Sequence, residues 1–519
     1  MARQSFIKAF LVSMVGTGLS RVLGLVRDVV IGNYLGAGAT ADAFWMAWTV
    51  PNAFRRFVAD EGLTGALIPG VARAEVEEGT PRAQTLANRV FTALLLVNAG
   101  IIALGMVFPE ALVYAFAYGF TEDPEKYALT VGMTRWLMPF LGMVSIVSFF
   151  EGLLNHRGHF FVPKVAPGLV SAGIAGVAVL FASSFQEPAW ALVAGVWVGG
   201  IAHVLVHLPI LHRLWGLPRP DLGFGGDRFQ AVTRELGKVV VIGLFAQVNL
   251  LVLRQMASFM MDGAVSRYTY ATRLVDLAQG VIAVAVGSAL LPGISTAVAA
   301  ADWERFKYDL TSALRLAAFI LIPSAVGLFV YAVPLTSLVF LRGRFTPEDV
   351  IWTASCLQLM TPFMLSVAGV NIVKKVFFAL EERNSLLWVG AIGVGITGAV
   401  GYALMGMDIL GLALALSVAT VAQLVMYVAL LRRRLGDRMP VGVLVSPLLK
   451  MSVATVPMAL FAYWAALHGQ WMDGLSGPNA FWFVVGAGGG ALLYALSAWM
   501  LGVEELNAIT RRVTSRFRK

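Results

Sequence analysis

Long apolar runs recur at short intervals along this chain of 519 residues, and they constrain its fold more than any other feature. A run of about 20 apolar residues is long enough to cross the hydrocarbon core of a bilayer as a helix. The runs cover residues 9–35, 41–70, 88–116, 129–153, 162–184, 188–211, 230–260, 265–297, 309–337, 349–379, 385–404, 408–431, 441–467 and 479–502. Only 13% of the residues are charged, against about 25% in soluble domains. The sequence therefore predicts an all-α polytopic membrane protein with about fourteen transmembrane helices.

The basic residues of the short loops predict the orientation, because loops rich in Lys and Arg stay in the cytoplasm. One alternating set of loops holds most of them: Arg3, Lys8, Arg73, Arg82, Arg157, Lys164, Arg213, Arg219, Arg228, Arg305, Lys307, Arg383, Arg432, Arg433, Arg434, Arg438 and the tail from Arg511 to Lys519. The other set holds little beyond Lys126, Arg342 and Arg344, and is rich in acids. Both termini are therefore expected in the cytoplasm, and the same bias accounts for the net charge of +9.

Three features argue against other classes of protein. Cys356 is the single cysteine, which excludes an intramolecular disulfide and favours a plain packing role. The first run carries charges and lacks a small-residue cleavage site, so we expect no cleavable signal peptide. Gly237-Lys238 lacks the rest of a Walker A motif, so ATP bound to this chain is not expected to drive transport.

A short repeated motif predicts two related halves. Ala66-Leu67-Ile68-Pro69-Gly70 ends the second run, and Ala289-Leu290-Leu291-Pro292-Gly293 ends the eighth. Two six-helix units are therefore expected, over residues 1–220 and 221–438, with the last two helices and the basic tail in 439–519. Parallel repeats of this kind occur in transporters whose halves rock about a central site.

Charged side chains lie inside the first apolar run, where a buried charge costs at least ~2.5–3.5 kcal/mol on insertion scales. Arg21 and Asp28 are seven residues apart and share one helix face. Arg27 lies about a third of a turn from Arg21. Such residues usually face a water-filled cavity or a partner.

The second run adds a polar face of its own. Asn52, Arg55 and Arg56 are spaced i, i+3 and i+4. Pro51 precedes them and is expected to kink the helix. Asp60-Glu61 lies within about a turn of Arg56 and can neutralise it.

The remaining charges of this stretch do not balance. Arg21, Arg27 and Arg55 have only Asp28 and Asp42 as acidic neighbours in the sequence. We therefore expect an anionic ligand to complete the charge balance.

The eighth run repeats the spacing of the first. Ser266-Arg267 and Arg273 match the Ser-Arg-x5-Arg pattern, Asp276 follows one turn later, and Arg254 lies on the preceding run. Arginine is always charged, and its planar fork of donors matches phosphate oxygens. Several arginines that converge from both halves would suit a diphosphate.

These arginines also have a structural interpretation, in which they pair with nearby acids or extend to the membrane surface. For Arg56 and Arg267 we weigh this interpretation equally with substrate binding. Substrate binding is preferred for Arg21, Arg27, Arg55 and Arg273. The role of Arg254 is left open.

Two weaker patterns are interpreted as structural. Gly393-Val394-Gly395-Ile396-Thr397-Gly398 matches a dinucleotide-binding fingerprint, but it lies inside an apolar run with no preceding strand, which favours helix packing. His203, His207 and His212 have no acid or cysteine beside them, so a role at the membrane interface is favoured over a metal site. We expect neither a metal nor a cofactor.

The polar motifs resemble the signatures of MurJ (also called MviN), the bacterial lipid II flippase family. The matching motifs are Ser20 to Asp28, Gly36-Ala37-Gly38, Asp42-Ala43-Phe44, Pro51-Asn52, Arg55-Arg56, Tyr270-Ala271-Thr272-Arg273-Leu274 and Leu291-Pro292. The resemblance implies the fold of the multidrug/oligosaccharidyl-lipid/polysaccharide exporter superfamily. In that fold two six-helix lobes enclose a central cavity, and the last two helices form a groove for a polyprenyl tail.

The resemblance also implies the substrate and its site. The substrate would be lipid II, the undecaprenyl-diphosphate-linked peptidoglycan precursor, moved from the cytoplasmic to the periplasmic leaflet of the inner membrane. The expected substrate-binding residues are Arg21, Arg27, Arg55, Arg273, Asp28, Asp42, Asn52, Arg56 and Arg254. We expect a monomer that is not an enzyme, binds no nucleic acid, and meets membrane lipid and possible cell-wall synthesis or division proteins.

Energy coupling and two alternative functions remain open at this level. Some family members are reported to bind sodium through acids of the seventh and eleventh helices, but residues 385–401 contain no acid here. Membrane potential is the expected driver, worth ~2.3 kcal/mol per charge per 100 mV. A drug or polysaccharide-precursor exporter is the alternative transporter, whereas an intramembrane enzyme would need a longer external loop than this chain has.

Overall fold

The computed structural model describes residues 2–55, 67–287, 291–436 and 441–506, and all the regular elements in these ranges are helices. By internal contacts the chain divides into two compact units, residues 1–266 and 267–519. The helix that begins at Asp227 packs against first-unit helices that begin at Thr80 and Pro109, which is why the first unit extends beyond residue 220. The three-part division expected from the sequence stays a prediction.

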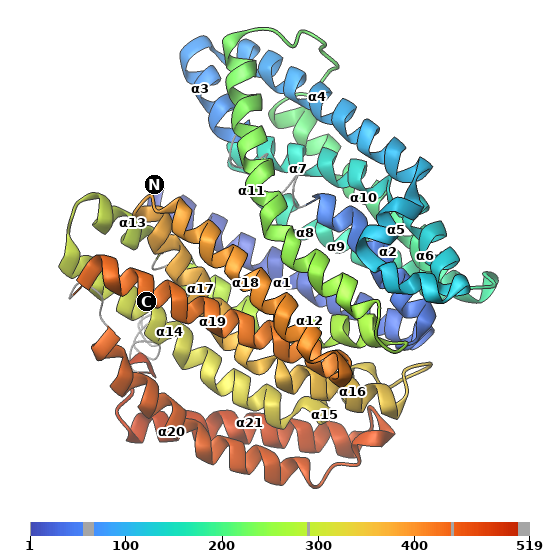
Figure 1. Ribbon diagram of the computed structural model, residues 1–519. Coiled ribbons are helices and arrows are strands. Elements are labelled where there is room, and N and C mark those ends of the chain that lie inside the picture. The colour runs from blue at the N-terminus through green and yellow to red at the C-terminus, as the bar shows by residue number, and fades with distance from the viewer. Residues whose placement is uncertain (1, 56–66, 288–290, 437–440, 507–519) are drawn as a thin grey trace. The chain divides into compact units, whose positions relative to one another are not determined.

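The first unit contains eleven α-helices in its described residues and the start of a twelfth (Figure 1). They are α1 (Ala2–Leu35), α2 (Ala39–Arg55), α3 (Ile68–Glu78), α4 (Thr80–Val107), α5 (Pro109–Ala117), α6 (Pro124–Leu137), α7 (Phe140–His156), α8 (Phe161–Val165), α9 (Pro167–Phe181), α10 (Ala189–Leu214), α11 (Asp227–Ala257) and the first turn of α12 (Ala264–Gly287). Two 3₁₀ helices, η3 (Tyr118–Glu122) and η4 (Ala182–Ser184), lie between them.

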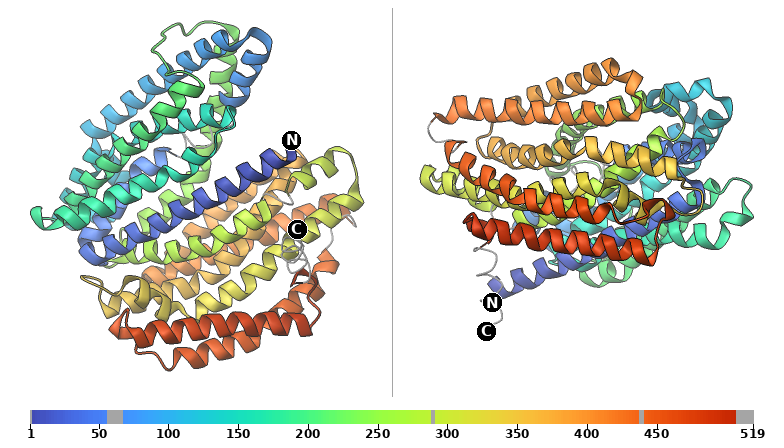
Figure 2. Two further views of the ribbon diagram at one scale, coloured as in Figure 1. Left: turned by 180° about the vertical axis from the view of Figure 1, so that it is seen from behind. Right: turned by 90° about the horizontal axis from the view of Figure 1, so that it is seen from below.

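The second unit is built in the same way. Its helices after α12 are α13 (Leu291–Ala299), α14 (Trp303–Val330), α15 (Ala332–Phe340), α16 (Pro347–Leu359), α17 (Thr361–Ala379), α18 (Arg383–Ala403), α19 (Ile409–Leu435), α20 (Val441–Ala466) and α21 (Gly477–Met500), with 3₁₀ turns η5 (Met405–Met407) and η7 (Trp471–Asp473). The last two, α20 and α21, lie side by side, with α20 also against α14 (Figures 1 and 2).

The prediction of an all-helical membrane protein is confirmed, and each apolar run corresponds to one helix or to two consecutive ones. Runs that hydropathy treats as continuous are broken at prolines, as between α4 and α5 at Pro109 and between α8 and α9 at Pro167. Proline is tolerated at a helix start but interrupts a helix interior, so each break begins a new helix there. Hydropathy alone does not detect these breaks.

Ten segments in the described residues are long and apolar enough to cross a membrane. Of the fourteen predicted runs, the other four correspond to α1, α2, α11 and α12, which carry the singled-out arginines that the structure describes. The count of fourteen spans and the cytoplasmic termini stay predictions.

The fold shows where the glycine motif at Gly393 and the repeated Pro-Gly motif lie. Gly393 of α18 lies so close to the Gln423 side chain of α19 that a Cβ would collide with it, which confirms that this glycine serves helix packing. The Pro-Gly pair of each repeated motif stands at the start of a short helix, α3 or α13. The residues just before these helices, 56–66 and 288–290, lie outside the described ranges.

Candidate functional site

The first candidate pair lies on α1, where Arg27 and Asp28 are bonded to each other. Arg27 Nε and Nη2 both donate to Asp28 Oδ1, at 2.9 and 2.7 Å. Asp28 is 1% exposed, whereas Arg21 on the same helix is exposed. The local pair lowers the net positive charge that this part of α1 presents, and leaves Arg21 as its most accessible arginine.

On α2 the predicted polar face is partly engaged in the helix itself. Asn52 Nδ2 donates to the carbonyl oxygen of Trp48 at 2.7 Å, one turn earlier. The Asn52 amide is thus engaged by the backbone of its own helix, beside the proline at position 51. Arg55, at the last described residue of α2, is half-buried. Arg56 lies outside the described residues.

Asp42, near the start of α2, is fully enclosed by donors. Its carboxylate accepts from Lys126 Nζ at 3.2 Å, from the backbone N–H of Gly263 and of Ser266 at 2.8 Å each, and from Ser266 Oγ at 2.7 Å. Asp42 is 0% exposed. The carboxylate therefore ties α2 to α6 and to the first turn of α12, and the geometry indicates a structural role.

Lys126 is the partner that the sequence did not single out. It was counted among the loop charges, but its side chain is buried, donates also to Asp262 Oδ1 at 2.8 Å, and lies 4.1 Å from the ring centre of Phe120. A lone lysine in the acidic set of loops was the available signal. Its partner Asp42 is 84 residues away, so no local pattern reveals the pair.

Arg273 is the more accessible of the two candidate arginines in the second unit. It lies on α12, and its Nη1 is 3.6 Å from Asp276 Oδ2, with 37% of the arginine side chain exposed. Arg267, six residues earlier on the same helix, is instead buried. It donates from Nε and Nη2 to Asp349 Oδ1 at 3.0 and 2.8 Å. This contact supports the structural interpretation of Arg267.

The predicted arginines are therefore distributed over both units. The first unit positions Arg21, Arg27, Arg55 and Arg254, and the second positions Arg273. Their convergence on one ligand stays a prediction.

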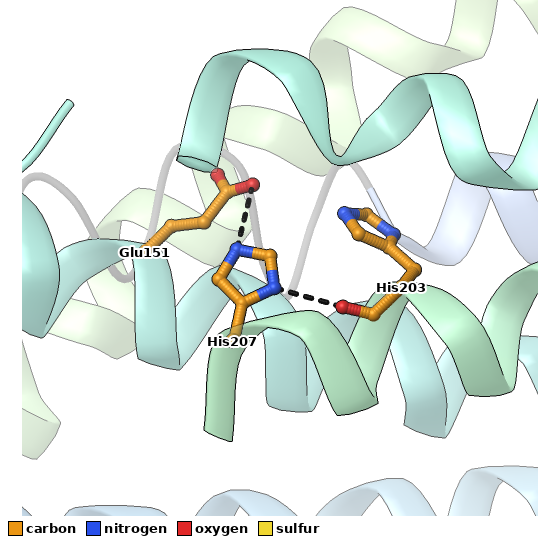
Figure 3. A group of neighbouring side chains, drawn as sticks. All are labelled: Glu151, His203 and His207. Atoms are coloured by element: carbon orange, nitrogen blue, oxygen red, sulfur yellow. Dashed lines mark hydrogen bonds and ion pairs between the residues drawn. The ribbon is translucent and has the colours of Figure 1, made fainter. Parts of the chain in front are cut away.

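A second group of polar residues lies between α7 and α10. Glu151 of α7 is beside His203 and His207 of α10, and one ligand atom from each lies within 4.8 Å of the others (Figure 3). The expectation that these histidines have no acid beside them is wrong, because the sequence shows only neighbours along the chain and Glu151 comes from another helix. His212, the third histidine, is exposed.

A charged cluster lies where α3 meets the end of α7. Glu75 accepts from His156 Nε2 at 2.6 Å and from Arg157 Nη2 at 2.8 Å. The hydrogen bond from His156, then those from Thr80 and Arg157, hold the pKa of the Glu75 carboxyl below its usual value despite its partial burial. Arg157 also stacks over Trp215, 4.7 Å from the ring centre.

The chain is similar to known proteins over most of its length. Residues 31–481 match the family described as Lipid II flippase MurJ. The Lipid II flippase MurJ of Burkholderia cenocepacia is 31% identical over 73% of this chain and 74% of its own. The Probable lipid II flippase MurJ of Bdellovibrio bacteriovorus is 30% identical over 98% of this chain and 97% of its own.

Solved structures show the same fold. Lipid II flippase MurJ in an inward closed conformation superposes with a TM-score of 0.77 at 21% identity, covering 94% of this chain and 98% of that one. An inward-facing multidrug resistance MATE family transporter of the MOP superfamily gives a TM-score of 0.65 at 14% identity, over 82% of this chain and 98% of that one.

Proposed function

Because this chain belongs to the lipid II flippase MurJ family, we propose that it moves lipid II from the cytoplasmic to the periplasmic leaflet by alternating access. The match over residues 31–481 is the observation that carries the proposal. It includes the last five residues of α1, 31–35, and all of α2 and α12, and it begins after Arg21, Arg27 and Asp28. The protein is then a transporter of the bacterial inner membrane rather than an enzyme.

The diphosphate of the substrate is the group that the arginines would bind. Arg21, Arg55 and Arg273 are exposed or half-buried, so their guanidinium groups are within reach of a ligand. Arginine forks bind phosphate oxygens through charge-assisted pairs of hydrogen bonds. A dianionic ligand would also compete with Asp28 for Arg27, which offers a switch between an internal pair and a bound state.

We assign the remaining predicted residues by their contacts. Asp42 holds the fold around α2, because its carboxylate bonds to Lys126, Gly263 and Ser266. Asn52 bonds to the backbone of its own helix. Arg254 on α11 remains a candidate ligand, as does Arg56. Asp28 acts on the substrate through Arg27.

The polyprenyl tail would remain in lipid beside α20 and α21. These two helices leave large apolar side chains exposed along their length: Val453, Val456, Leu460, Val484, Leu492 and Leu496. A hydrocarbon chain that stays against such surface remains in lipid, so only the headgroup has to be moved past the charged helices.

Binding and release would follow from differential affinity for two states of the carrier. A ligand shifts a conformational equilibrium only by the difference between its affinities for the two states. The substrate charge reduces repulsion among the arginines, which favours closure around it. Membrane potential then biases the cycle by ~2.3 kcal/mol per charge per 100 mV.

Complementation tests the proposal. Cells depleted of their own flippase would express this chain, and a colicin that cleaves lipid II outside the membrane would report the flipped fraction. We expect cleavage to be restored by the wild-type chain and lost in Arg273→Ala and Arg27→Ala at equal protein levels. Arg213 is an exposed arginine at the end of α10. The Arg213→Ala variant is therefore the matched control and should retain cleavage.

Arg273→Lys separates charge from geometry, because lysine keeps the charge but not the planar fork. Reduced cleavage in that variant would support bidentate binding of the diphosphate. Stable, membrane-inserted wild-type protein that restores no cleavage would contradict the proposal and favour the related exporter of drugs or polysaccharide precursors.

A further inference from the structure

Two neighbouring helices of the first unit bring three potential metal ligands together. The helices α7 and α10 pack against each other, and Gly200 of α10 lies close to Phe140 and Met143 of α7. Toward the carboxyl ends of the same helices, Glu151 faces His203 and His207 (Figure 3). None of these three side chains has a part in the proposed binding of lipid II.

The two histidines are buried with unsatisfied nitrogen atoms. His207 is 0% exposed and His203 is 5% exposed. Among the described residues, neither ring nitrogen of His203 and not Nε2 of His207 has a hydrogen-bond partner. Buried polar atoms almost always have partners, because leaving them without one costs free energy. The three nitrogen atoms therefore call for a ligand that the described part of the chain does not provide.

The hydrogen bond of His207 fixes which of its nitrogens is available. Nδ1 lies 2.8 Å from the carbonyl oxygen of His203, one turn earlier on α10. A carbonyl oxygen only accepts, so Nδ1 carries the proton and Nε2 keeps its lone pair. Nε2 faces Glu151, 4.0 Å from Oε1. A hydrogen bond from the other ring nitrogen to a backbone carbonyl is the usual way to orient a metal-binding histidine.

The spacing suits a borderline divalent ion. Histidines four residues apart on one helix present their rings to the same ion, and a carboxylate from a second helix completes a His₂Glu set. One ligand atom from each residue lies within 4.8 Å of the others. Tetrahedral zinc needs these atoms at about 3.4 Å, so modest side-chain rotations would close the site.

We propose that Glu151, His203 and His207 bind a divalent transition-metal ion, with Zn²⁺ as the best fit. Imidazole and carboxylate ligands together favour zinc over calcium or magnesium, which prefer oxygen ligands alone. A fourth position is left for water or for His159, which lies within electrostatic range of His207 and has a buried Nε2 without a hydrogen bond in the described residues.

The bound ion would join α7 to α10 close to the end of α2. Arg55 lies within electrostatic range of His203. The positive charge of the Arg55 guanidinium repels a metal ion bound at this site. The negative charge of the Glu151 carboxylate offsets that repulsion. Metal binding is therefore coupled by charge to an arginine proposed to bind the substrate, and removal of the Arg55 charge should tighten the metal site.

Direct metal binding to the full-length protein tests this proposal. Purified protein, freed of any histidine tag and stripped with a chelator, would be titrated with Zn²⁺ against a chromophoric competitor. Bound zinc would then be counted by elemental analysis. We expect one Zn²⁺ per chain, a loss of at least tenfold in affinity in His203→Gln, His207→Gln and Glu151→Gln, and tighter binding in Arg55→Gln. Co²⁺ should give the absorption bands of a tetrahedral site.

His212→Gln is the matched control, since His212 lies on α10 but is exposed. It should bind zinc as the wild-type chain does. Each variant is compared by thermal unfolding without metal, so that a folding defect is recognised, and zinc should raise the melting temperature of the wild-type chain but not of His207→Gln. Absence of zinc from the wild-type chain at micromolar free metal, or zinc that is lost only in His212→Gln, would overturn the proposal.

Discussion

The two units each contain a buried ion pair at equivalent helix positions, with the charges exchanged. In the first unit Asp42 is the fourth residue of α2 and Lys126 is the third residue of α6. In the second unit Arg267 is the fourth residue of α12 and Asp349 is the third residue of α16. Both α6 and α16 begin with a proline. We infer that these pairs are counterparts in the two related halves that the repeated motif predicts.

The acidic residues of the two ion pairs, Asp42 and Asp349, differ in their other hydrogen-bond partners. Asp42 accepts from two backbone N–H groups and a hydroxyl besides Lys126, so it fastens the stretch from Gly263 to Ser266 that leads into α12. Asp349 pairs with Arg267 and otherwise caps its own helix, through the backbone N–H and the hydroxyl of Thr346. One acid therefore organises distant segments, and the other mainly organises a single helix start.

The largest effect is expected for Asp42→Ala. The substitution leaves Lys126 buried with Asp262 as its acidic partner among the described residues, and it removes the acceptor of two backbone donors. Breaking a buried pair costs ~3–5 kcal/mol. Equilibrium unfolding of the purified protein in detergent would measure the loss of stability. Asp262→Ala, which removes a mostly exposed partner of Lys126, should cost less than ~1 kcal/mol, and equal losses in the two variants would contradict the account.

Exchanging the two charges within each ion pair should restore stability in the second unit but not in the first. In the second unit, Arg267→Asp with Asp349→Arg should recover most of the loss seen in Arg267→Ala, leaving the cost of the helix cap, ~0.5–2 kcal/mol. In the first unit, Asp42→Lys with Lys126→Asp should recover little, because a lysine cannot accept from Gly263 and Ser266. The same unfolding measurement applies, and equal recovery in both units would show that the difference drawn between them is wrong.

The smallest effect is expected for Glu75. Its ion pairs with His156 and Arg157 are less buried than the Asp42–Lys126 and Arg267–Asp349 pairs. Its carboxyl has a lowered pKa, so its pairing with His156 and Arg157 contributes stability above the ordinary carboxyl pKa and loses it as the pH falls through the lowered value. Thermal unfolding followed from pH 6 downward should therefore show a smaller loss in Glu75→Gln than in the wild-type chain. Identical pH dependence in the two would contradict this assignment.

Much of the fold could be predicted because length and apolar character directly decide what crosses a bilayer. The runs at 188–211 and 408–431 match α10 and α19 closely. The run at 88–116 proved to be two helices, since the break at Pro109 leaves hydropathy unchanged. The charged helices were recognisable for the opposite reason, because arginine in an apolar run has few structural explanations.

The partners of these charges could not be predicted in the same way. Lys126 had the signature of a loop charge and Glu151 had no signature at all, yet both lie against residues from distant helices. Pairing across 84 residues depends on how the helices pack, which local spacing does not encode. The pair formed by Arg27 and Asp28 is different, since adjacent residues can be paired from the sequence alone.

The bonds of Asp42 have a consequence for synthesis. Two of its donors, Gly263 and Ser266, follow it by 221 and 224 residues. At about 5–20 residues per second, a ribosome adds that length in roughly 10–45 s. During this interval the inserted α2 exposes an incompletely bonded carboxylate to the translocon or to an insertase. The first unit thus completes its hydrogen bonding only when its own last residue, Ser266, leaves the ribosome.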